Sequence, residues 1–228
     1  MPADSPDPAA PRPLSSPDFI AGEILRGLYA GRYVPGQRLV EADLTREYKV
    51  SRGSIREALK RLAAEGTVAL TLHRGAYIRA LSRGEVAEVL ALVEVLTGLA
   101  ARLAAERIAQ ADNRDRVAKA MEELAAAEAG GDAYQFARAR DRFYRALVLA
   151  GGNRELARVL PTMQVHLVRT QFRPAEAPGD NRLGDYRRVV AAVLSGDAAA
   201  AEAAMRQHIR AGSERIQRLP DEAFAPEP

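Results

Sequence analysis

The feature that most constrains the fold is a short amphipathic stretch, SRGSIREALKRL, at residues 51–62. Its apolar side chains recur at the spacing i, i+3, i+4 and i+7, which places them on one face of a helix. These are Ile55, Ala58, Leu59 and Leu62. Three basic residues also repeat every fourth position and form a separate cationic row: Arg52, Arg56 and Lys60. Such a helix is suited to pack inward on a core and to contact a polyanion outward.

The start of this helix is defined only to within one turn by the sequence. Ser51 is a good N-cap, and Ser54 with Glu57 has the S-x-x-E spacing of a capping box. Either start leaves Arg52 and Ser54 near the helix N-terminus, where free N–H groups and the helix dipole favour phosphate.

The flanking segments complete the pattern of a winged helix-turn-helix. Residues 41–48 read as a short preceding helix, and residues 49–50 as the turn. Residues 68–72 and 76–78 read as two strands of a β-hairpin wing. We also expect a helix at residues 19–30, ended by the Gly31 and Pro35-Gly36 turns, and a possible short strand at Arg38 and Leu39. The sequence therefore predicts a winged helix-turn-helix domain over residues 18–80.

This segment resembles the GntR family of bacterial transcription regulators. The matching positions are Pro35-Gly36, Glu41, Leu44, Val50-Ser51-Arg52, Ile55-Arg56-Glu57-Ala58-Leu59, Leu62, Glu65-Gly66 and Arg74-Gly75. Gly53 and Ser54 depart from the family, which often has Thr-Pro or Thr-Thr there. The resemblance implies that double-stranded operator DNA is the partner.

We expect the DNA contacts to divide by chemistry. Arg52 and Arg56 should reach base edges in the major groove, most plausibly guanine. Phosphates should be held by Ser51, Ser54 and Lys60, and the wing turn Arg74-Gly75 should enter or follow the minor groove. Gly53 and Arg38 belong to the same predicted surface. His73 is either a phosphate or minor-groove contact or an exposed turn residue.

The distribution of charge favours the same segment. Residues 18–80 hold 11 Lys or Arg and 7 Asp or Glu, a net charge of +4, whereas residues 81–228 hold 21 of each kind. A basic excess on this segment is what DNA binding requires, although ordinary solubilising surface gives a similar value.

Composition excludes several other classes. The chain has no cysteine, which excludes disulfides and thiolate metal sites and is compatible with the cytoplasm. Residues 1–17 read as a disordered tail without a signal peptide, and residues 220–228 as a second loose tail. The most apolar stretch, residues 86–105, carries Glu88, Glu94 and Arg102, so we expect a buried helix and no membrane partner.

From residue 82 onward, strand signals give way to helical patterns rich in alanine and leucine. We expect helices at residues 84–109, 113–129, 132–150, 153–173, 181–195 and 198–218, the first with an S-x-x-E start at Ser82 and the fourth kinked at Pro161. Short connections between long amphipathic helices favour an antiparallel bundle. The predicted fold is mainly α, with a winged helix-turn-helix followed by an all-α bundle over residues 81–219.

This second half resembles the FCD domain, the helical effector-binding module of the GntR subfamily that includes the fatty-acid regulator FadR. The matching pieces are GLAARLA at residues 98–104, FYRALVLAGGN at residues 143–153 and AVLSGDAAAAEAAMRQHI at residues 192–209. The resemblance implies a ligand pocket inside the bundle and a homodimer.

Many FCD domains hold a divalent metal with one Asp and three His, and three of these four positions differ here. Arg140 stands at the Asp position, Tyr144 and Tyr186 stand at two His positions, and only His208 is retained. Asp141 is one residue out of register, about 100° round the helix. Because a cation beside the site repels a metal, we predict no structural metal and no cofactor.

The same substitutions predict a metal-free effector pocket for a small organic acid or acyl-type ligand. Arg140 would pair with the acidic group, while Tyr144, Tyr186 and His208 would donate hydrogen bonds. Val93 and Thr97 align with pocket-facing positions of the family. Alternatively, the tyrosines fill the space of the lost metal and hydrogen-bond each other. Four further arginines either line a second anion site or are solvated, the latter being favoured: Arg169, Arg173, Arg187 and Arg188.

The sequence thus predicts a ligand-responsive transcription regulator, a repressor in the first instance, that binds a palindromic operator as a homodimer. The alternative is an effector-blind DNA-binding protein whose bundle serves only dimerisation. No nucleophile–base pair, phosphate loop or paired carboxylates stand in a recognisable context, so no catalytic residue is predicted. His166 reads as an ordinary, partly buried histidine.

Overall fold

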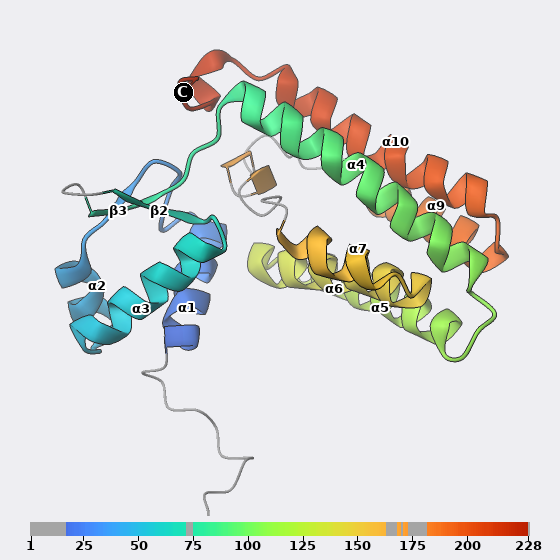
Figure 1. Cartoon of the computed structure of the whole chain (residues 1–228), viewed down its shortest axis with the longest axis horizontal. Helices are drawn as coiled ribbons and strands as arrows, with labels where there is room; N and C mark the ends of the chain where they lie inside the picture. Colours follow the sequence, from blue (N-terminus) through green and yellow to red (C-terminus); the bar gives the residue numbers. More distant parts are fainter. Residues whose placement is uncertain (1–16, 72–74, 163–167, 170, 173–181, 228) are drawn as a thin grey trace, which may run out of the picture.

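The computed structural model describes residues 17–71, 75–162, 168–169, 171–172 and 182–227. Its described part is mainly helical and forms two domains in sequence order (Figure 1). A small domain ends with the strand that finishes at Ile78, and an elongated helical domain begins at Arg83. Each has a hydrophobic core of its own.

The N-terminal domain contains three helices and a small sheet. The helices are α1 (Pro17–Ala30), α2 (Glu41–Tyr48) and α3 (Arg52–Ala64). The strands are β1 (Arg38–Leu39), β2 (Val68–Thr71) and β3 (Gly75–Ile78), in the order β1-β3-β2 with both pairs antiparallel. The short strand at Arg38 and Leu39 is therefore confirmed, and it extends the hairpin to three strands.

The register of the sheet ties the wing to the helices. Arg38 lies opposite Tyr77 and Val68 lies opposite Ile78, so β3 is held on both sides. Gly66 ends the segment after α3 with a φ of 73°, a left-handed conformation that glycine adopts without strain. The chain can therefore turn from α3 directly into β2.

Helix α3 packs as its periodicity predicts. Ile55, Ala58, Leu59 and Leu62 are all buried, in one cluster with Ile20 and Ile24 of α1 and Leu44 of α2. Its start is now resolved, because the Ser51 side chain accepts a hydrogen bond from the Ser54 backbone N–H at 3.1 Å. Ser51 is thus the N-cap.

The helical domain follows the predicted series of helices closely. Its described elements are α4 (Arg83–Glu106), α5 (Asn113–Ala129), α6 (Ala133–Gly151), α7 (Arg154–Val159), η1 (Leu160–Thr162), α9 (Arg182–Ser195), α10 (Ala198–Gln217) and η3 (Asp221–Ala223). Helix α4 lies along α10, and α5 lies along α6. The predicted capping box at Ser82 and Glu85 is present at the start of α4.

Small residues allow these helices to approach closely. A Cβ atom placed on Gly151 of α6 would lie 2.9 Å from the Cβ of Leu103 on α4, closer than packing allows. Ala100, Ala101 and Ala104 of α4 are also buried. Helices α4 and α6 are therefore packed in close contact.

The fourth predicted helix, expected over residues 153–173 with a kink at Pro161, ends earlier than predicted. Helix α7 ends at Val159 and the 3₁₀ turn η1 follows, because proline cannot donate the helical hydrogen bond. Residues 163–167, and with them His166, lie outside the described residues, as do Arg173 and the wing residues His73 and Arg74.

The last residues contradict the prediction of a loose tail, up to residue 227. The Ala225 backbone N–H donates to the carbonyl of Leu81 at 3.0 Å. The Glu227 carboxylate accepts hydrogen bonds from the Ser82 hydroxyl at 2.8 Å and from the Gly84 N–H at 3.0 Å. The segment therefore packs on the connection between the two domains, beside the start of α4 (Figure 1).

Candidate DNA-binding surface and ligand pocket

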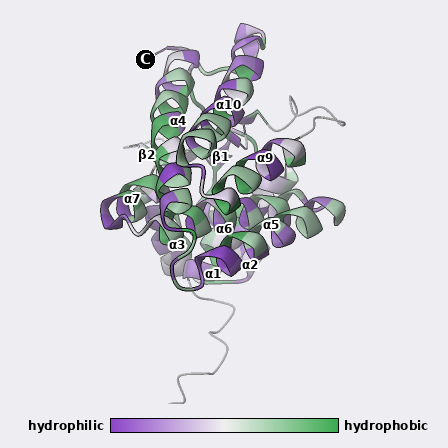
Figure 2. Ribbon diagram, turned by 90° about the vertical axis from the view of Figure 1, so that its right-hand side faces the viewer, coloured by the Kyte–Doolittle hydropathy of each residue, from purple (hydrophilic) through white to green (hydrophobic). Residues whose placement is uncertain are grey.

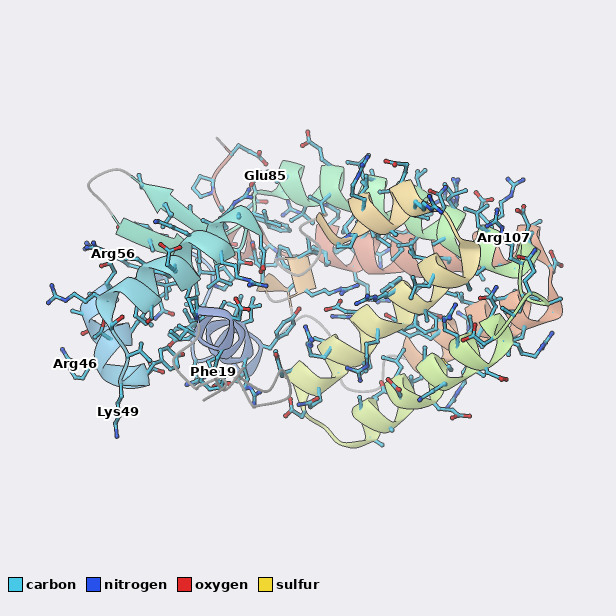
Figure 3. The ribbon with its side chains drawn as sticks, turned by 60° about the horizontal axis from the view of Figure 1, so that its bottom comes forward. Phe19, Arg46, Lys49, Arg56, Glu85 and Arg107 are labelled. Atoms are coloured by element: carbon cyan, nitrogen blue, oxygen red, sulfur yellow. The ribbon has the colours of Figure 1, made fainter. Side chains whose placement is uncertain are left out.

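The outward face of α3 carries the predicted basic row. Arg52, Arg56 and Lys60 are all exposed, on the side of the helix opposite its buried stripe. Figure 3 shows Arg56 on the outer side of this domain, with Arg46 and Lys49 of the α2–α3 region at its far end. These side chains make one surface of positive groups.

Two members of the row are engaged by carboxylates. The Arg56 Nε donates to both carboxylate oxygens of Glu41 on α2, at 3.2 and 2.9 Å. Lys60 donates to Glu57 at 2.8 Å. Exposed ion pairs of this kind contribute about 0–1 kcal/mol, so a phosphate or a base edge can displace them at small cost.

Arg52 differs from its two neighbours. It makes no ion pair or side-chain hydrogen bond with any residue that the structure describes. Because Arg52 lies in the first turn of α3, its guanidinium can bind another group without first breaking a contact with a described residue.

The remaining predicted contacts lie around this helix. Ser51 and Ser54 are at its N-terminus, where their hydroxyls lie 3.0 Å apart, and Gly53 is exposed beside them. Arg38 is exposed, and its guanidinium lies 3.8 Å from where a Cβ on Gly75 would be. Arg38 therefore lies beside Gly75, the first residue of β3.

Sequence reasoning missed one candidate on this surface. Lys49 is exposed in the turn between α2 and α3, with a φ of 54°. Its position in the turn of the helix-turn-helix could have identified it, but the sequence pattern was interpreted there only as a turn.

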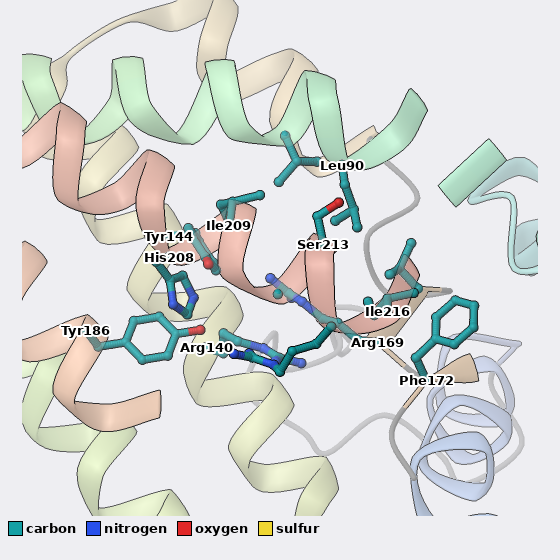
Figure 4. Close-up of a pocket in the computed structure, with 14 residues that line it drawn as sticks. Leu90, Arg140, Tyr144, Arg169, Phe172, Tyr186, His208, Ile209, Ser213 and Ile216 are labelled. Carbon is teal, nitrogen blue, oxygen red and sulfur yellow. The ribbon is translucent and has the colours of Figure 1, made fainter. Parts of the chain in front are cut away.

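The ligand site predicted in the helical domain corresponds to a cavity of about 100 Å³. Figure 4 shows Arg140, Tyr144, Tyr186 and His208 around it, brought from α6, α9 and α10. Val93 of α4 lines the same cavity. Five of the six predicted effector residues are thus brought together.

The charge of this cavity is one-sided. Three arginines line it, Arg140, Arg169 and Arg215, and none of the described residues that line it is Asp or Glu. Figure 4 shows the side chains of Arg140 and Arg169 among those that line it. A small cavity with several guanidiniums is suited to an anionic group.

Arg169 corrects one interpretation of the sequence. We expected a solvated helix face, but its side chain is only 13% exposed and lines the cavity. Its Nη1 donates to Asp141 Oδ1 at 2.7 Å. The interpretation holds for Arg187 and Arg188, which are both exposed.

His208 is oriented by a partner that the sequence did not reveal. Its Nδ1 lies 3.2 Å from Asp185 Oδ2, and its ring centroid is 4.5 Å from that of Tyr186. Burial lowers the pKa of His208 below its usual range, and the hydrogen bond with Asp185 opposes this. In the neutral ring, Nδ1–H donates to the carboxylate, so Nε2 can only accept a hydrogen bond. The expectation that His208 donates to a ligand is therefore wrong for the neutral ring.

The two tyrosines pack as an aromatic group. The Tyr186 ring lies 5.2 Å from Phe143 and 6.4 Å from Tyr144, both edge to face. Burial raises the pKa of the Tyr144 hydroxyl, so it remains protonated and can donate. This geometry is compatible both with ligand contact and with the tyrosines filling the space themselves.

The side chains at the four aligned metal-ligand positions do not suit the divalent metal that many FCD domains bind. Arg140 places a cation where the family has a carboxylate, burial raises the pKa of the Tyr144 phenol, and the Tyr186 ring packs against the Tyr144 ring. No group of three His, Asp or Glu side chains gathers among the described residues. The absence of a metal nevertheless stays a prediction.

A second, larger cavity of about 540 Å³ adjoins the first. Val93, Tyr144 and Arg169 line both cavities. Thr97, the sixth predicted effector residue, lines the second one, and its hydroxyl donates to the Val93 carbonyl at 2.7 Å. Apolar residues of α6, α7 and η1 complete much of its wall: Val148, Leu149, Leu156, Leu160 and Pro161.

A helix-turn-helix with a small antiparallel sheet, followed by a helical domain with an internal cavity, defines a DNA-binding transcription regulator that carries a second module. None of the described helices combines the length and the apolar character needed to span a bilayer.

Comparison with known families agrees with this class. The FCD domain matches residues 85–211, and the family of bacterial regulatory proteins called gntR matches residues 17–78. Since the FCD match covers more than half of the chain, the protein belongs to the GntR family of transcriptional regulators with a C-terminal FCD domain. This is a family of regulators and not of enzymes.

Two relatives match over most of their length. The "Probable D-xylose utilization operon transcriptional repressor" of Paenarthrobacter nicotinovorans is 29% identical over 195 residues, 85% of this chain and 84% of that protein. The HTH-type transcriptional regulator LutR of Bacillus subtilis (strain 168) is 30% identical over 203 residues, 78% of this chain and 91% of its own.

Solved structures share the fold. A transcriptional regulator GntR from Rhodococcus sp. RHA1 superposes with a TM-score of 0.73 at 20% identity, covering 90% of this chain and 99% of that one. Escherichia coli McbR/YncC superposes with a TM-score of 0.72 at 18% identity, covering 90% and 98%. At these identities the likeness concerns the fold alone.

Proposed function

We propose that the protein represses transcription by binding a palindromic operator as a homodimer in the cytoplasm, and that a small organic acid in the helical domain controls this binding. The observation that carries the ligand part is the cavity lined by three arginines and by no described carboxylate. Repression is supported by the relative from Paenarthrobacter nicotinovorans, whose name describes a repressor.

The DNA-binding surface supports operator recognition. Arg52 extends from the first turn of α3 without an ion pair among the described residues, and Arg56 is held only by an exposed pair with Glu41. Arginine is the side chain that pairs bidentately with guanine in the major groove. Ser51, Ser54, Lys60 and the wing side near Arg38 and Gly75 are placed to hold phosphates.

An exposed apolar strip on α4 supports the homodimer. Leu92 is 56% exposed and Val95 is 48% exposed, one helical turn apart. Helix α4 is largely green, and therefore hydrophobic, in Figure 2. A two-fold contact between α4 helices would cover these side chains and place two recognition helices on the half-sites of a palindrome.

The pocket supports an acid as the effector. Arg140 and Arg169 would pair with a carboxylate, Tyr144 would donate to it, and neutral His208 would accept from a hydroxyl. Ligand binding would then shift the DNA-binding domains toward a relative orientation that does not fit the operator.

The first experiment is selection of operator sequences from a random duplex library by the full chain. We expect enrichment of an inverted repeat, and loss of that enrichment in the Arg52→Ala variant. Enrichment of a single half-site would contradict dimeric binding. Absence of any enrichment would contradict operator recognition itself.

One observation supports the alternative of an effector-blind protein. The rings of Tyr144 and Tyr186 pack against each other and fill part of the pocket. This alternative predicts that operator affinity is independent of every acid tested. Operator affinity measured with and without a saturating carboxylate separates the two, because only the ligand-responsive protein changes its affinity for the operator.

A further inference from the structure

The larger cavity has no role in the function proposed so far. It is about five times the volume of the arginine-lined cavity and shares a wall of Val93, Tyr144 and Arg169 with it. A molecule held at Arg169 is therefore at the boundary of both spaces.

The two cavities differ in chemistry. The smaller one, which we call the acid chamber, presents Arg140, Arg169 and Arg215. The larger one, which we call the apolar chamber, is lined on much of its surface by Val148, Leu149, Leu156, Leu160 and Pro161. The apolar chamber also has polar lining residues, among them Asp141 and Arg145. Asp141 forms an ion pair with Arg169 at 2.7 Å.

We propose that the effector is a monocarboxylic acid with an apolar body, whose carboxylate lies in the acid chamber and whose body extends past Tyr144 into the apolar chamber. This inference rests on the proposed function, since it names the class of ligand for the same site. Arg169 has the central position: its guanidinium pairs with Asp141 on one side and faces the acid chamber on the other.

The charge arrangement selects one acidic group over two. Asp141, on the wall of the apolar chamber, is a carboxylate that would repel a second ligand carboxylate there. The apolar side chains beside it favour a hydrocarbon group, because removing hydrocarbon surface from water is favourable. Short hydrophilic acids would fill only the acid chamber.

The test measures binding of straight-chain carboxylates from acetate to decanoate to the full chain by isothermal titration. We expect affinity to rise about fourfold per added CH₂ until the apolar chamber is full. Ala157→Trp places a large side chain at an exposed position of α7 on the wall of this chamber, and it should flatten that dependence while acetate binds as before. Ala126→Trp, at an exposed position of α5 that lines neither cavity, is the matched control and should behave as wild type.

The outcomes separate this inference from the proposed function. Carboxylates that bind with the same affinity at every chain length would overturn the apolar chamber and leave the acid effector standing. Failure of every carboxylate to bind, with binding of inorganic phosphate, would overturn both. A chain-length dependence that persists unchanged in Ala157→Trp would place the hydrocarbon elsewhere.

A separate set of contacts links the acid chamber to the connection between the domains. Phe172 lines the chamber, and its ring centroid lies 5.0 Å from that of Phe224 in the C-terminal segment. The Arg83 guanidinium lies 4.1 Å from the centre of the Phe224 ring and donates to the Leu219 carbonyl at 2.7 Å.

The side chain of the neighbouring Gln171 forms hydrogen bonds with the connection between the domains. Its side-chain oxygen accepts from the Leu81 N–H at 2.7 Å, and its side-chain nitrogen donates to the Leu81 carbonyl at 2.9 Å and to the Ala223 carbonyl at 3.1 Å. Leu81 lies between β3, the last strand of the DNA-binding domain, and α4. One glutamine thus joins the chamber side, the C-terminal segment and the connection.

From these contacts we infer that residues 220–227 form a strap through which ligand binding reorients the DNA-binding domain. The strap is bonded at Ser82 and Gly84 by Glu227 and is in contact with the chamber through Phe224. A ligand that moves Phe172 would therefore move the connection at the same time. This second inference also rests on the proposed function.

The test compares operator affinity with and without a saturating carboxylate in wild type, Phe224→Ala and Glu227→Gln. Both variants should keep the carboxylate affinity of wild type within threefold, while the change in operator affinity falls to less than twofold. Phe19→Ala, at an exposed position of α1, is the control and should respond as wild type. A wild-type response in Phe224→Ala and Glu227→Gln would overturn the strap, whereas an unresponsive wild type would overturn the proposed function.

Discussion

Replacing Leu92 and Val95 by aspartate is expected to separate the dimer into 24.7 kDa monomers. Full burial of a leucine or valine side chain stabilises by about 1.5–3 kcal/mol, and roughly half of each is already buried, which leaves about 1 kcal/mol per side chain. Two-fold symmetry counts both positions twice, so the pair contributes about 4 kcal/mol, or about a thousandfold in the dimer dissociation constant. Covering an aspartate adds a desolvation cost, which makes this a lower bound.

Sedimentation velocity over a range of protein concentrations measures this shift. The Val159→Asp variant is the control, because Val159 is an apolar side chain that is 38% exposed and belongs to a different helix, α7. An unchanged circular dichroism spectrum checks that each variant is folded. A double variant that remains dimeric at wild-type concentrations would refute the assignment of α4 as the dimer contact.

Three further outcomes are expected. Arg52→Ala should cost about 1–3 kcal/mol of operator binding and relax base preference at one position, and a uniform small loss on all sequences in an anisotropy titration would reduce Arg52 to a phosphate contact. Arg140→Ala should weaken carboxylate binding roughly tenfold or more with operator affinity retained, and an unchanged response would remove Arg140 from the ligand site. Burial lowers the pKa of His208, so the unfolded chain takes up its proton first. The free energy of unfolding should therefore fall as the pH drops through about 6.5, the ordinary histidine value, and His208→Gln should make this fall shallower in denaturant titrations. An equally steep fall in that variant would assign the effect to other groups.

Local chemistry made much of the fold predictable. The spacing of Ile55, Ala58, Leu59 and Leu62 defined α3, and the S-x-x-E pattern at Ser82 defined the start of α4. At Pro161 the sequence predicted a kink, because a proline cannot donate in a helix, and α7 in fact ends two residues earlier, at Val159. In each case the deciding interactions lie within a few residues along the chain.

Long-range pairs were outside the reach of this reasoning. Arg169 pairs with Asp141 across 28 residues, and nothing near Arg169 in the sequence shows that its side chain is largely buried. The C-terminal segment has no periodicity, and its anchor from Glu227 to Ser82 spans 145 residues. The ion pair of Arg56 with Glu41 was also missed, because Glu41 belongs to a different helix, α2. The sequence identified Glu41 only as a position that matches the family.

The measurement that tests the central claim most directly is the affinity of the full chain for its selected operator, with and without a saturating medium-chain carboxylate, by fluorescence anisotropy. We expect the acid to weaken operator binding by at least fivefold, and the operator to weaken acid binding by the same factor, because the coupling is reciprocal. Equal operator affinity with and without an acid that demonstrably binds would contradict ligand control and would favour an effector-blind regulator.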